Sequence, residues 1–567
     1  MTIPYEESGS GGESLPATDG VPNGYSLFYD ASSGIAKWGQ SSISTTGAQD
    51  NNILTYKSST NKIVWSSPTI NLKEFLQTTA TPQLEGTFFG TSAGDKLHGC
   101  DITNDGDYIV LGYSKHNSGR GLVRVYKITN RSTNTWTQVG GDIVGATTSS
   151  ELGKMVKIAK DDPTVIVIRT EEGGTVNTPD VGVWVYKFSN DAWAAMHTYP
   201  LTAWVDSTVD THWSVTESIP TVVGVSISDD GTRVAMSHHK NDYRGNVAIY
   251  NYVNGSWTGT QIPHPNNVSG ASFPDSANNG QAYPVNDGFG MRLALSGDGN
   301  ALVCGFHYYM DNGSGSGRGG VRVAKYINDV WTWVNWGSSS THKMRGEHSN
   351  SEFGSQIAIS YDGNTVAASD PRRNDSASAV GSINLYRYDE SLSTYVFEQT
   401  FTAHFTPYGG GHGQQFGWTG DADLHQTLAL SSNGFRLVVG SPTSSGLPSS
   451  NLTYMGQVFV YNKDSNNVWS IDGNYTWSGG SFGSGTFGNG GNGNSTFINI
   501  VSDAETGARF GGCVGFSKDA TRLIVTAFRD DNTSGVDAGL AKVYTLPAAL
   551  SSGSIYYGSD GILRIQP

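Results

Sequence analysis

The chain has 567 residues, a formal net charge of −15 at pH 7 and a pI near 5.3. This acidic balance excludes nucleic acid as the expected partner, because a phosphate backbone requires a basic surface. No segment approaches the length of a membrane-spanning helix, so membrane insertion is not expected. The 73 glycines and the low share of charged residues, 15%, are typical of a turn-rich all-β protein.

Residues 1–22 are small and polar, which predicts a flexible N-terminal arm or a segment ordered only against a partner. The arm has neither the basic region nor the apolar run of a secretory signal, so classical secretion is not expected. Residues 23–85 then form a predicted N-terminal β-hairpin segment. Within it, 24–38 and 51–65 each predict a strand, a polar turn and a second strand that ends in Trp, at Trp38 and Trp65.

The C-terminal tail, residues 547–567, repeats this pattern, with predicted strands at 555–557 and 562–565 around a Ser-Asp-Gly turn. The terminal hairpins resemble those found in fibre and other structural proteins of tailed phages and large DNA viruses. That resemblance implies a role in anchoring or assembly. An ordinary hairpin without such a role is the alternative.

Residues 86–546 contain seven copies of one hairpin pattern. In the best copy, 357–360 predicts a short apolar strand, Asp362-Gly363 a tight primed turn, and 365–369 the returning strand. The seven turns lie near Asp105, Asp161, Asp230, Asp298, Asp362, Asn433 and Asp519. Seven copies of one hairpin predict a repeat protein.

A second signature follows each hairpin, a Gly that is usually five residues before a Tyr in an alternating strand pattern. The signature glycines, Gly121, Gly182, Gly245, Gly320, Gly381, Gly456 and Gly539, are 61 to 83 residues apart. A Trp on a predicted fourth strand follows in most copies, at Trp136, Trp193, Trp257, Trp331 and Trp469. Four strands per repeat predict a seven-bladed β-propeller. Its last blade is completed either by residues around 81–88 or by the C-terminal hairpin.

Phe-Gly pairs precede several hairpins, at Phe289-Gly290, Phe353-Gly354, Phe416-Gly417 and Phe510-Gly511. With the alternating strand after the signature Gly, they resemble the FG-GAP repeats of integrin-α-like propellers and their bacterial and viral relatives. The resemblance covers residues 86–546 and implies the propeller fold, but it says little about function.

Calcium loops of integrin-type blades are rich in acidic residues, whereas most turns here carry one acid plus Gly. The nearest approach to such a loop is Asp101, Asp105 and Asp107, which are candidate calcium ligands. Their alternative role is to cap and solvate the hairpin. Cys100, Cys304 and Cys513 fall in or beside predicted hairpin strands without a CxxC spacing, so they are predicted to be buried thiols.

Long loops rich in Gly, Ser, Asn and aromatic residues separate the predicted strands, at 307–318, 407–418 and 475–497. Aromatic side chains make rigid contacts and stack on sugar rings, and Ser and Asn adapt their hydrogen bonds. The candidate binding residues are Tyr308, Tyr309, Tyr408, His412, Trp418, Tyr475, Trp477, Phe482 and Phe487. A tolerated insertion without binding function is the alternative for 475–497.

A catalytic constellation is not evident in the sequence, because the turns lack the Trp of sialidase Asp boxes and the arginines are scattered. We therefore expect a binding or structural protein that is not an enzyme. The most concrete hypothesis is a virion structural protein, a fibre or exterior capsid component. Its N-terminal segment would contact other virion proteins, and its propeller would bind a host-surface glycan or protein, with a homo-oligomer expected.

The location expected under this hypothesis is the virion. The alternatives are a cellular surface adhesin or lectin-like propeller, located outside the cell or on its surface, and a glycan hydrolase.

Overall fold

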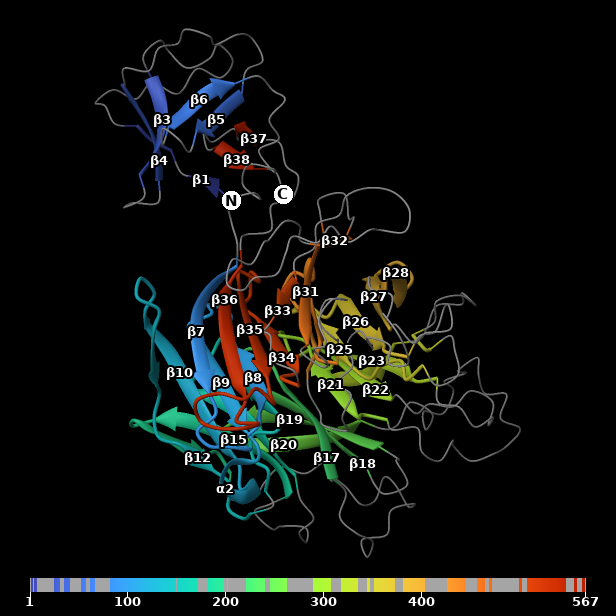
Figure 1. Cartoon of the computed structure of the whole chain (residues 1–567). Coiled ribbons are helices and arrows are strands. Elements are labelled where there is room, and N and C mark those ends of the chain that lie inside the picture. Colours follow the sequence, from blue (N-terminus) through green and yellow to red (C-terminus); the bar gives the residue numbers. More distant parts are fainter. Residues whose placement is uncertain are drawn as a thin grey trace, which may run out of the picture. The chain divides into compact units, whose positions relative to one another are not determined.

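The computed structural model describes the propeller with gaps at its longest connections and, outside the propeller, the backbone of short strands near both chain ends (Figure 1). The described residues are 2–3, 5–7, 25–30, 35–40, 53–57, 62–66, 82–148, 150–171, 181–197, 201, 221–239, 245–262, 289–306, 318–334, 344–346, 351–372, 381–402, 426–443, 456–463, 469–471, 499–501, 507–546, 555–557 and 563–565.

Seven antiparallel sheets of at least four strands follow one another along the chain and form the seven blades of a β-propeller. The innermost strands are β8 (Leu97–Ile102), β13 (Val156–Ile158), β17 (Thr221–Ile227), β21 (Arg292–Leu295), β25 (Ile357–Ile359), β29 (Leu428–Leu430) and β34 (Phe510–Phe516). The second strands are β9 (Tyr108–Tyr113), β14 (Val165–Glu171), β18 (Arg233–His239), β22 (Ala301–Phe306), β26 (Thr365–Asp370), β30 (Arg436–Ser441) and β35 (Arg522–Ala527). The predicted fold class is confirmed.

The third strands are β10 (Leu122–Asn130), β15 (Val181–Ser189), β19 (Gly245–Val253), β23 (Gly320–Ile327), β27 (Ser382–Asp389), β31 (Gln457–Lys463) and β36 (Leu540–Thr545). The outermost strands are β11 (Thr135–Gln138), β16 (Ala192–Ala195), β20 (Ser256–Ile262), β24 (Val330–Trp333), β28 (Thr394–Thr402), β32 (Trp469–Ile471) and β7 (Gln83–Phe89). Short strands β12 (Ile143–Val144) and β33 (Asn499–Val501) pair with β10 and β31. The five predicted tryptophans all lie on fourth strands, as expected.

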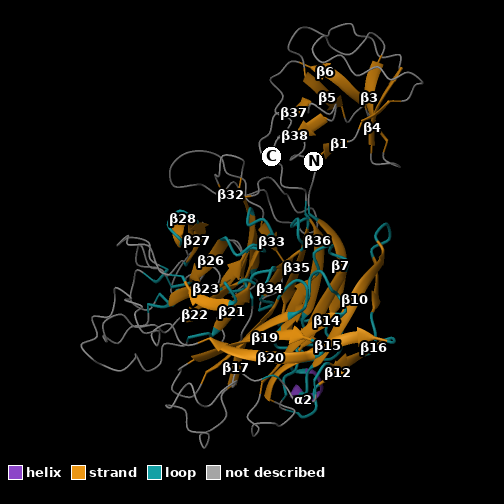
Figure 2. Ribbon diagram, turned by 180° about the vertical axis from the view of Figure 1, so that it is seen from behind, coloured by secondary structure: helices purple, strands orange, loops and turns teal. Residues whose placement is uncertain are grey.

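Strands dominate the described part of the propeller, as Figure 2 shows. The helix drawn there, α2 (His116–Gly119), is one turn in which Asn117 and Ser118 have left-handed backbone angles. The predicted one or two helical turns at 72–77 lie outside the described residues. Among the described residues, no helix is long and apolar enough to cross a membrane.

Ring closure is achieved by β7, which supplies the outermost strand of the blade that β34, β35 and β36 begin. Leu540 to Thr545 pair antiparallel with Gln83 to Phe89, so the blue β7 lies beside the red β36 in Figure 1. Of the two predicted routes to closure, the one through residues 81–88 is therefore correct. Because β7 begins at Gln83, the boundary between the hairpin segment and the propeller lies near residue 82 rather than at 85/86.

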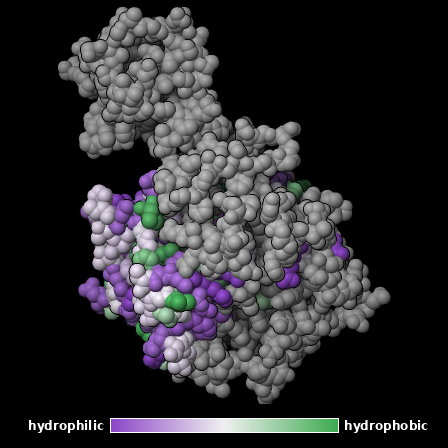
Figure 3. Space-filling view, viewed as in Figure 1, coloured by the Kyte–Doolittle hydropathy of each residue, from purple (hydrophilic) through white to green (hydrophobic). Residues whose placement is uncertain are grey.

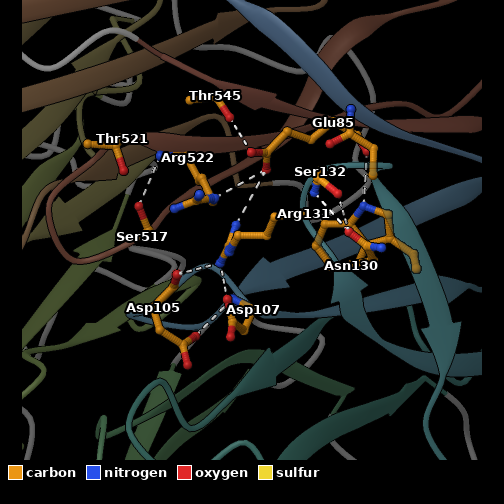
Figure 4. Close-up of polar contacts among 12 residues, drawn as sticks. Glu85, Asp105, Asp107, Asn130, Arg131, Ser132, Ser517, Thr521, Arg522 and Thr545 are labelled. Atoms are coloured by element: carbon orange, nitrogen blue, oxygen red, sulfur yellow. Dashed lines mark hydrogen bonds and ion pairs between the residues drawn. The ribbon is translucent and has the colours of Figure 1, made fainter. Parts of the chain in front are cut away.

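Side chains reinforce this closure around Glu85 of β7 (Figure 4). Arg522 Nε lies 3.2 Å from Glu85 Oε2, and Thr545 Oγ1 donates to Glu85 Oε1. Arg131 of the first blade approaches the same carboxylate at 4.0 Å and also pairs with Asp107. The Glu85 carboxylate therefore links the closing strand to both the last and the first blade.

The turn between first and second strands differs from the predicted primed turn. Ser360 O accepts a hydrogen bond from Gly363 N, and only Gly363 of the turn has a positive φ, 71°. Ser360 Oγ donates to Asp362 Oδ1 and accepts from Thr365 N, at 2.6 and 2.9 Å. These side-chain bonds hold a five-residue connection with an Asx-type cap, so a two-residue primed turn is not needed.

The same side-chain bond recurs in six blades, always from a Ser or Thr to the Asp or Asn two residues later. The pairs are Thr103–Asp105, Ser228–Asp230, Ser296–Asp298, Ser360–Asp362, Ser431–Asn433 and Ser517–Asp519. Tight primed turns do occur, but they connect third to fourth strands. Asn190-Asp191, Asn254-Gly255 and Asn328-Asp329 all have positive φ at both positions.

We expect the acid sensitivity of the fold to depend partly on these turns. Burial raises the pKa of Asp519, but hydrogen bonds from Thr521 and Ser517 outweigh burial, so the pKa is lowered. The pKa of Asp230 is lowered in the same way, because hydrogen bonds from Ser228 and Thr232 outweigh its burial. A depressed folded-state pKa stabilises the fold above the unfolded pKa, near 3.8, and this contribution is lost as pH falls through the folded value.

The double variant Asp230→Asn/Asp519→Asn should therefore be less stable than the wild type at pH 7, and the difference should shrink towards pH 2. Asn433 already occupies this position in the sixth blade, so the amide fits the turn. Urea unfolding midpoints between pH 7 and pH 2 measure the difference. A gap that stays constant over this range would contradict the assignment.

The signature glycines have a structural reason, since their backbone is approached closely by the next blade. Gly319 and Gly456 form backbone bridges with Phe353 and Phe510 of the Phe-Gly pairs, and Gly121 does so with Leu152. A Cβ at Gly456 would lie 2.1 Å from the carbonyl oxygen of Phe510. In the fourth blade this place is taken by Gly319, one residue before the predicted Gly320.

Apolar side chains of neighbouring blades pack against one another and form the core. One cluster joins the first and last blades and contains Cys100, Cys513, Ile524 and Val543. Cys304 lies in a second cluster. All three cysteines are buried thiols, as predicted.

Outside the propeller, strands near both chain ends belong to a separate terminal unit that includes residues 1–81 and 547–567. Its strands are β1 (Thr2–Ile3), β2 (Tyr5–Glu7), β3 (Tyr25–Asp30), β4 (Ile35–Gln40), β5 (Ile53–Lys57), β6 (Lys62–Ser66), β37 (Ile555–Tyr557) and β38 (Leu563–Ile565). The three predicted hairpins are β3–β4, β5–β6 and β37–β38. The predicted flexible arm is wrong for β1 and β2, because β1 pairs with β38 and β2 with β4.

Candidate functional site

The nine predicted binding residues lie outside the described residues, so the structure shows only the strand ends that flank them. Tyr308 and Tyr309 lie between β22 and β23, and Tyr408, His412 and Trp418 between β28 and β29. Tyr475, Trp477, Phe482 and Phe487 lie between β32 and β33. These connections join a second strand to a third strand, or leave a fourth strand towards the next blade.

Connections of these two kinds begin and end at the same rim of a propeller, because the four strands of each blade are antiparallel. We call this the insertion rim. The opposite rim, which we call the turn rim, carries the connections from first to second strands, each of five or six residues. All three predicted binding segments therefore start and end at the insertion rim.

The turn rim is held together by backbone hydrogen bonds that run from blade to blade around the hub. The donors and acceptors are Asn104 N to Lys160 O, Asp161 N to Asp229 O, Asp229 N to Gly297 O, Asp298 N to Tyr361 O, Tyr361 N to Ser432 O, Ser432 N to Lys518 O, and Lys518 N to Asn104 O. Seven bonds thus form a closed circle. The turn rim is therefore held together by a closed circle of hydrogen bonds between neighbouring blades.

Side chains add to this circle. Asn104 Nδ2 donates to Asp161 Oδ1 at 2.7 Å and to Asp229 Oδ2 at 2.8 Å, and the Lys518 ammonium lies 5.2 Å from the centre of the Tyr361 ring. Burial raises the pKa of Asp229, while Lys160 and the Asn104 amide act in the opposite direction. The polar groups of this rim mostly satisfy one another.

The central channel between the innermost strands contains a cavity of about 110 Å³, to which all seven blades contribute. At one depth of the channel each blade contributes one residue to the wall, and most of these residues are small. Each lies three positions before a residue of the same blade that takes part in the circle of hydrogen bonds. They are Asp101, Lys157, Ser226, Ala294, Ala358, Ala429 and Gly515. Arg292, Gln356 and Gln426 lie closer to the insertion rim and line the same cavity.

The candidate calcium ligands Asp101, Asp105 and Asp107 are not brought together. Asp101 is buried and accepts from Ile102 N and Ile158 N. Asp105 accepts from Thr103 Oγ1 and from the backbone of Asp107, while the Asp107 carboxylate pairs with Arg131 (Figure 4). Within the described ranges, no group of three or more His, Cys, Asp or Glu residues could hold a metal ion. Asp105 thus has the capping role that was the alternative.

On the face that Figure 3 shows, the described surface is mostly hydrophilic, with hydrophobic residues scattered over it. Leu84, Val253, Val330, Leu392 and Val536 are among the exposed ones and come from four blades, with Leu84 and Val536 both in the last blade. Scattered apolar residues are normal on a protein surface and do not mark a docking patch.

No protein-family model matches the chain, and no curated protein matches it in sequence. Among solved structures, a putative 6-phosphogluconolactonase from Bacteroides uniformis is 12% identical with a TM-score of 0.38, and the match covers 66% of this chain and 83% of that one. A protein of the same description from Bacteroides fragilis is 12% identical with a TM-score of 0.37, over 70% of this chain and 94% of that one.

A likeness with a TM-score below 0.5 shows neither the substrate nor the activity of this chain. Both structures carry the name of an enzyme, however, so the prediction that this chain is not an enzyme is corrected and is not maintained. The FG-GAP resemblance is supported at the level of the propeller, but no family model matches it. The descriptions of these two structures give no support to the resemblance of the terminal hairpins to viral proteins.

Proposed function

We propose that the chain is a virion structural protein, a fibre or exterior capsid component, whose propeller binds a host-surface glycan or protein through the insertion rim. The observation that carries the proposal is the structural difference between the two rims. The turn rim is held together by a circle of seven backbone hydrogen bonds. All three aromatic-rich segments begin and end at the insertion rim. Such a scaffold positions variable loops on a rigid base, as binding proteins commonly do.

The terminal unit supports the anchoring half of this proposal. Strands β1 and β38, from opposite ends of the chain, pair with each other, so both chain ends belong to one small β structure. All strands of the seven blades therefore lie in sequence between the two parts of this structure. In the proposal this unit contacts other virion proteins and assembles the chain into a homo-oligomer.

The binding half is tested with the full-length protein on a glycan array and on host cells. The test variant replaces 475–497, which contains four of the nine aromatic candidates, by a short Gly-Ser linker. We expect binding to fall at least tenfold, because stacked aromatic contacts carry much of such affinity. The matched control replaces Ser132 and Thr133, in an exposed turn between a third and a fourth strand, by Gly and should bind like the wild type.

Equal binding by the wild type and the loop variant would contradict the role of the 475–497 segment. The anchoring half is tested by antibody labelling of purified particles viewed by electron microscopy. Label on particles supports a virion component, whereas label confined to cell walls would favour the alternative of a cellular adhesin. Release of sugars from the array would point instead to the glycan hydrolase.

A further inference from the structure

Two of the three cysteines meet where the ring closes. Cys100 lies on β8, the innermost strand of the first blade, and Cys513 on β34, the innermost strand of the last blade. Both belong to the buried cluster that joins these blades, and they are 1% and 4% exposed. They are 413 residues apart in sequence, so a covalent bond between them would join the two ends of the propeller.

A strand irregularity brings the two side chains together. The pairing of β34 with β35 shifts register between Phe510 and Val514, and Cys513 lies inside this bulge. Bulges change the direction of a side chain, and here the Cys513 N–H donates to Thr526 Oγ1 at 3.0 Å. The Cys513 thiol donates to the Cys100 carbonyl oxygen at 3.4 Å, and the two sulfurs lie within hydrogen-bond reach of each other.

The strands that carry the pair are fixed against each other. Lys518 N, five residues after Cys513, donates to Asn104 O at 2.9 Å as part of the circle on the turn rim. Between these points, a Cβ added to Gly515 would lie 3.4 Å from Asp101 Oδ1. A disulfide requires that the two Cα atoms lie within about 7 Å of each other, and strands in such close contact meet this need.

The two thiols differ in reactivity. As a thiolate, Cys513 accepts a hydrogen bond from the Cys100 thiol, which lowers the pKa of Cys513; burial opposes this effect and the Lys157 ammonium adds to it. Burial instead raises the pKa of Cys100. Asp101 opposes ionisation of both sulfurs. Cys513 is therefore the sulfur that ionises first, and the thiolate is the form of cysteine that attacks an oxidant.

A small cavity lies directly beside the pair. Its volume is about 10 Å³, and both cysteines line it. Met155, Lys157 and Gln426 line this cavity and also the channel cavity of about 110 Å³, so the two cavities are neighbours at the hub. The small cavity has room for about one water, so only an oxidant of nearly that size reaches the sulfurs from the channel.

We propose that Cys100 and Cys513 form a modification site, which hydrogen peroxide oxidises to a disulfide that covalently links the last blade to the first. The Cys513 thiolate attacks one peroxide oxygen, the O–O bond breaks, and the leaving hydroxide takes up the proton that Cys513 released, which gives water and a sulfenic acid. The Cys100 sulfur then attacks the Cys513 sulfur. The S–S bond forms, the S–O bond breaks, and the displaced hydroxide takes up the Cys100 proton as a second water.

This modification is independent of the proposed host-binding function, because neither cysteine lies in the segments assigned to binding. The test treats the native full-length protein with hydrogen peroxide, removes the peroxide with catalase, and alkylates the remaining thiols after unfolding. Mass spectrometry of the peptides should find Cys100 linked to Cys513, and Cys304, which lies in another cluster, still alkylated. Glutathione disulfide should react about tenfold more slowly or less, because both sulfurs are buried.

Three alkylated cysteines after peroxide treatment would overturn the proposal. A link from Cys100 or Cys513 to Cys304 or to a second chain would overturn it as well. Equal rates with peroxide and glutathione disulfide would contradict access through the small cavity.

The effect on the ring is measured as a thermal midpoint of the same samples. A cross-link that closes so long a loop should raise the midpoint by about 5 °C, and dithiothreitol should reverse the rise. The variant Cys513→Ala should show neither the link nor the rise, whereas the matched control Cys304→Ala should show both. The link itself is sought in the wild type, so the proposal is tested even if Cys513→Ala fails to fold. A disulfide that leaves the midpoint unchanged would contradict its role in holding the blades together.

Discussion

A chain that spans residues 82–546 is expected to unfold cooperatively, whereas a chain that spans 91–546 is expected to lose cooperative unfolding. The shorter chain lacks β7, which pairs with β36 from Leu540 to Thr545 and carries the buried Phe88 and Glu85. Its loss leaves an open sheet edge and a gap between the last and first blades. The free energy of unfolding should fall by more than about 5 kcal/mol, the lower end of the usual stability of a domain.

The measurement is urea unfolding of both chains, followed by circular dichroism and tryptophan fluorescence. The longer chain serves as the control, because it lacks the terminal unit but keeps the closing strand. A synthetic peptide of residues 82–90 added to the shorter chain should restore part of the lost stability. If both chains unfold with the same midpoint and slope, closure by β7 does not hold the ring.

The variant Gly456→Ala is expected to destabilise the propeller by about 3 kcal/mol or more. Gly456 has a φ of +82°, and an added Cβ would lie 2.1 Å from the Phe510 carbonyl oxygen and 2.4 Å from its backbone nitrogen. A left-handed backbone alone costs an alanine about 1–2 kcal/mol. The clash with backbone of the next blade adds to this, because neither strand moves without breaking its pairing.

A matched control separates the two costs. Gly255 has a nearly equal φ, +84°, but nothing lies within 4 Å of its added Cβ. Gly255→Ala should therefore cost only the conformational term, about 1–2 kcal/mol. Unfolding midpoints in urea compare the two variants at equal denaturant slope. Equal losses would mean that the close approach of Phe510 to Gly456 is not what requires glycine.

Several elements were predictable because their signals are local. The strand pair 357–359 and 365–370 follows from two apolar runs around a Ser-x-Asp-Gly turn, and this pattern recurs along the chain. The five tryptophans fell on fourth strands for the same reason. The turn type was not predicted correctly, because the Ser360 and Asp362 side chains form hydrogen bonds that a dipeptide preference does not contain.

The sites were less predictable than the strands. Asp101, Asp105 and Asp107 are close in sequence, yet strand geometry and the Arg131 side chain direct them to different partners. The Glu85 network joins residues more than 400 positions apart, since Arg522 and Thr545 both reach it from the end of the chain. Gln356 gave no sequence signal, because it is buried against a cavity that only the assembled blades enclose.

Repetition in the sequence was sufficient to establish seven blades of four strands, since each blade is specified by hairpin and strand patterns within about 80 residues. Only the tertiary structure decided that β7 closes the ring, that a circle of hydrogen bonds joins the blades at the turn rim, and that a cavity lies at the hub. The physical reason is the distance along the sequence over which the interactions act. Strand and turn preferences act between neighbours along the chain, whereas closure, the circle of hydrogen bonds and the channel arise only where seven blades meet.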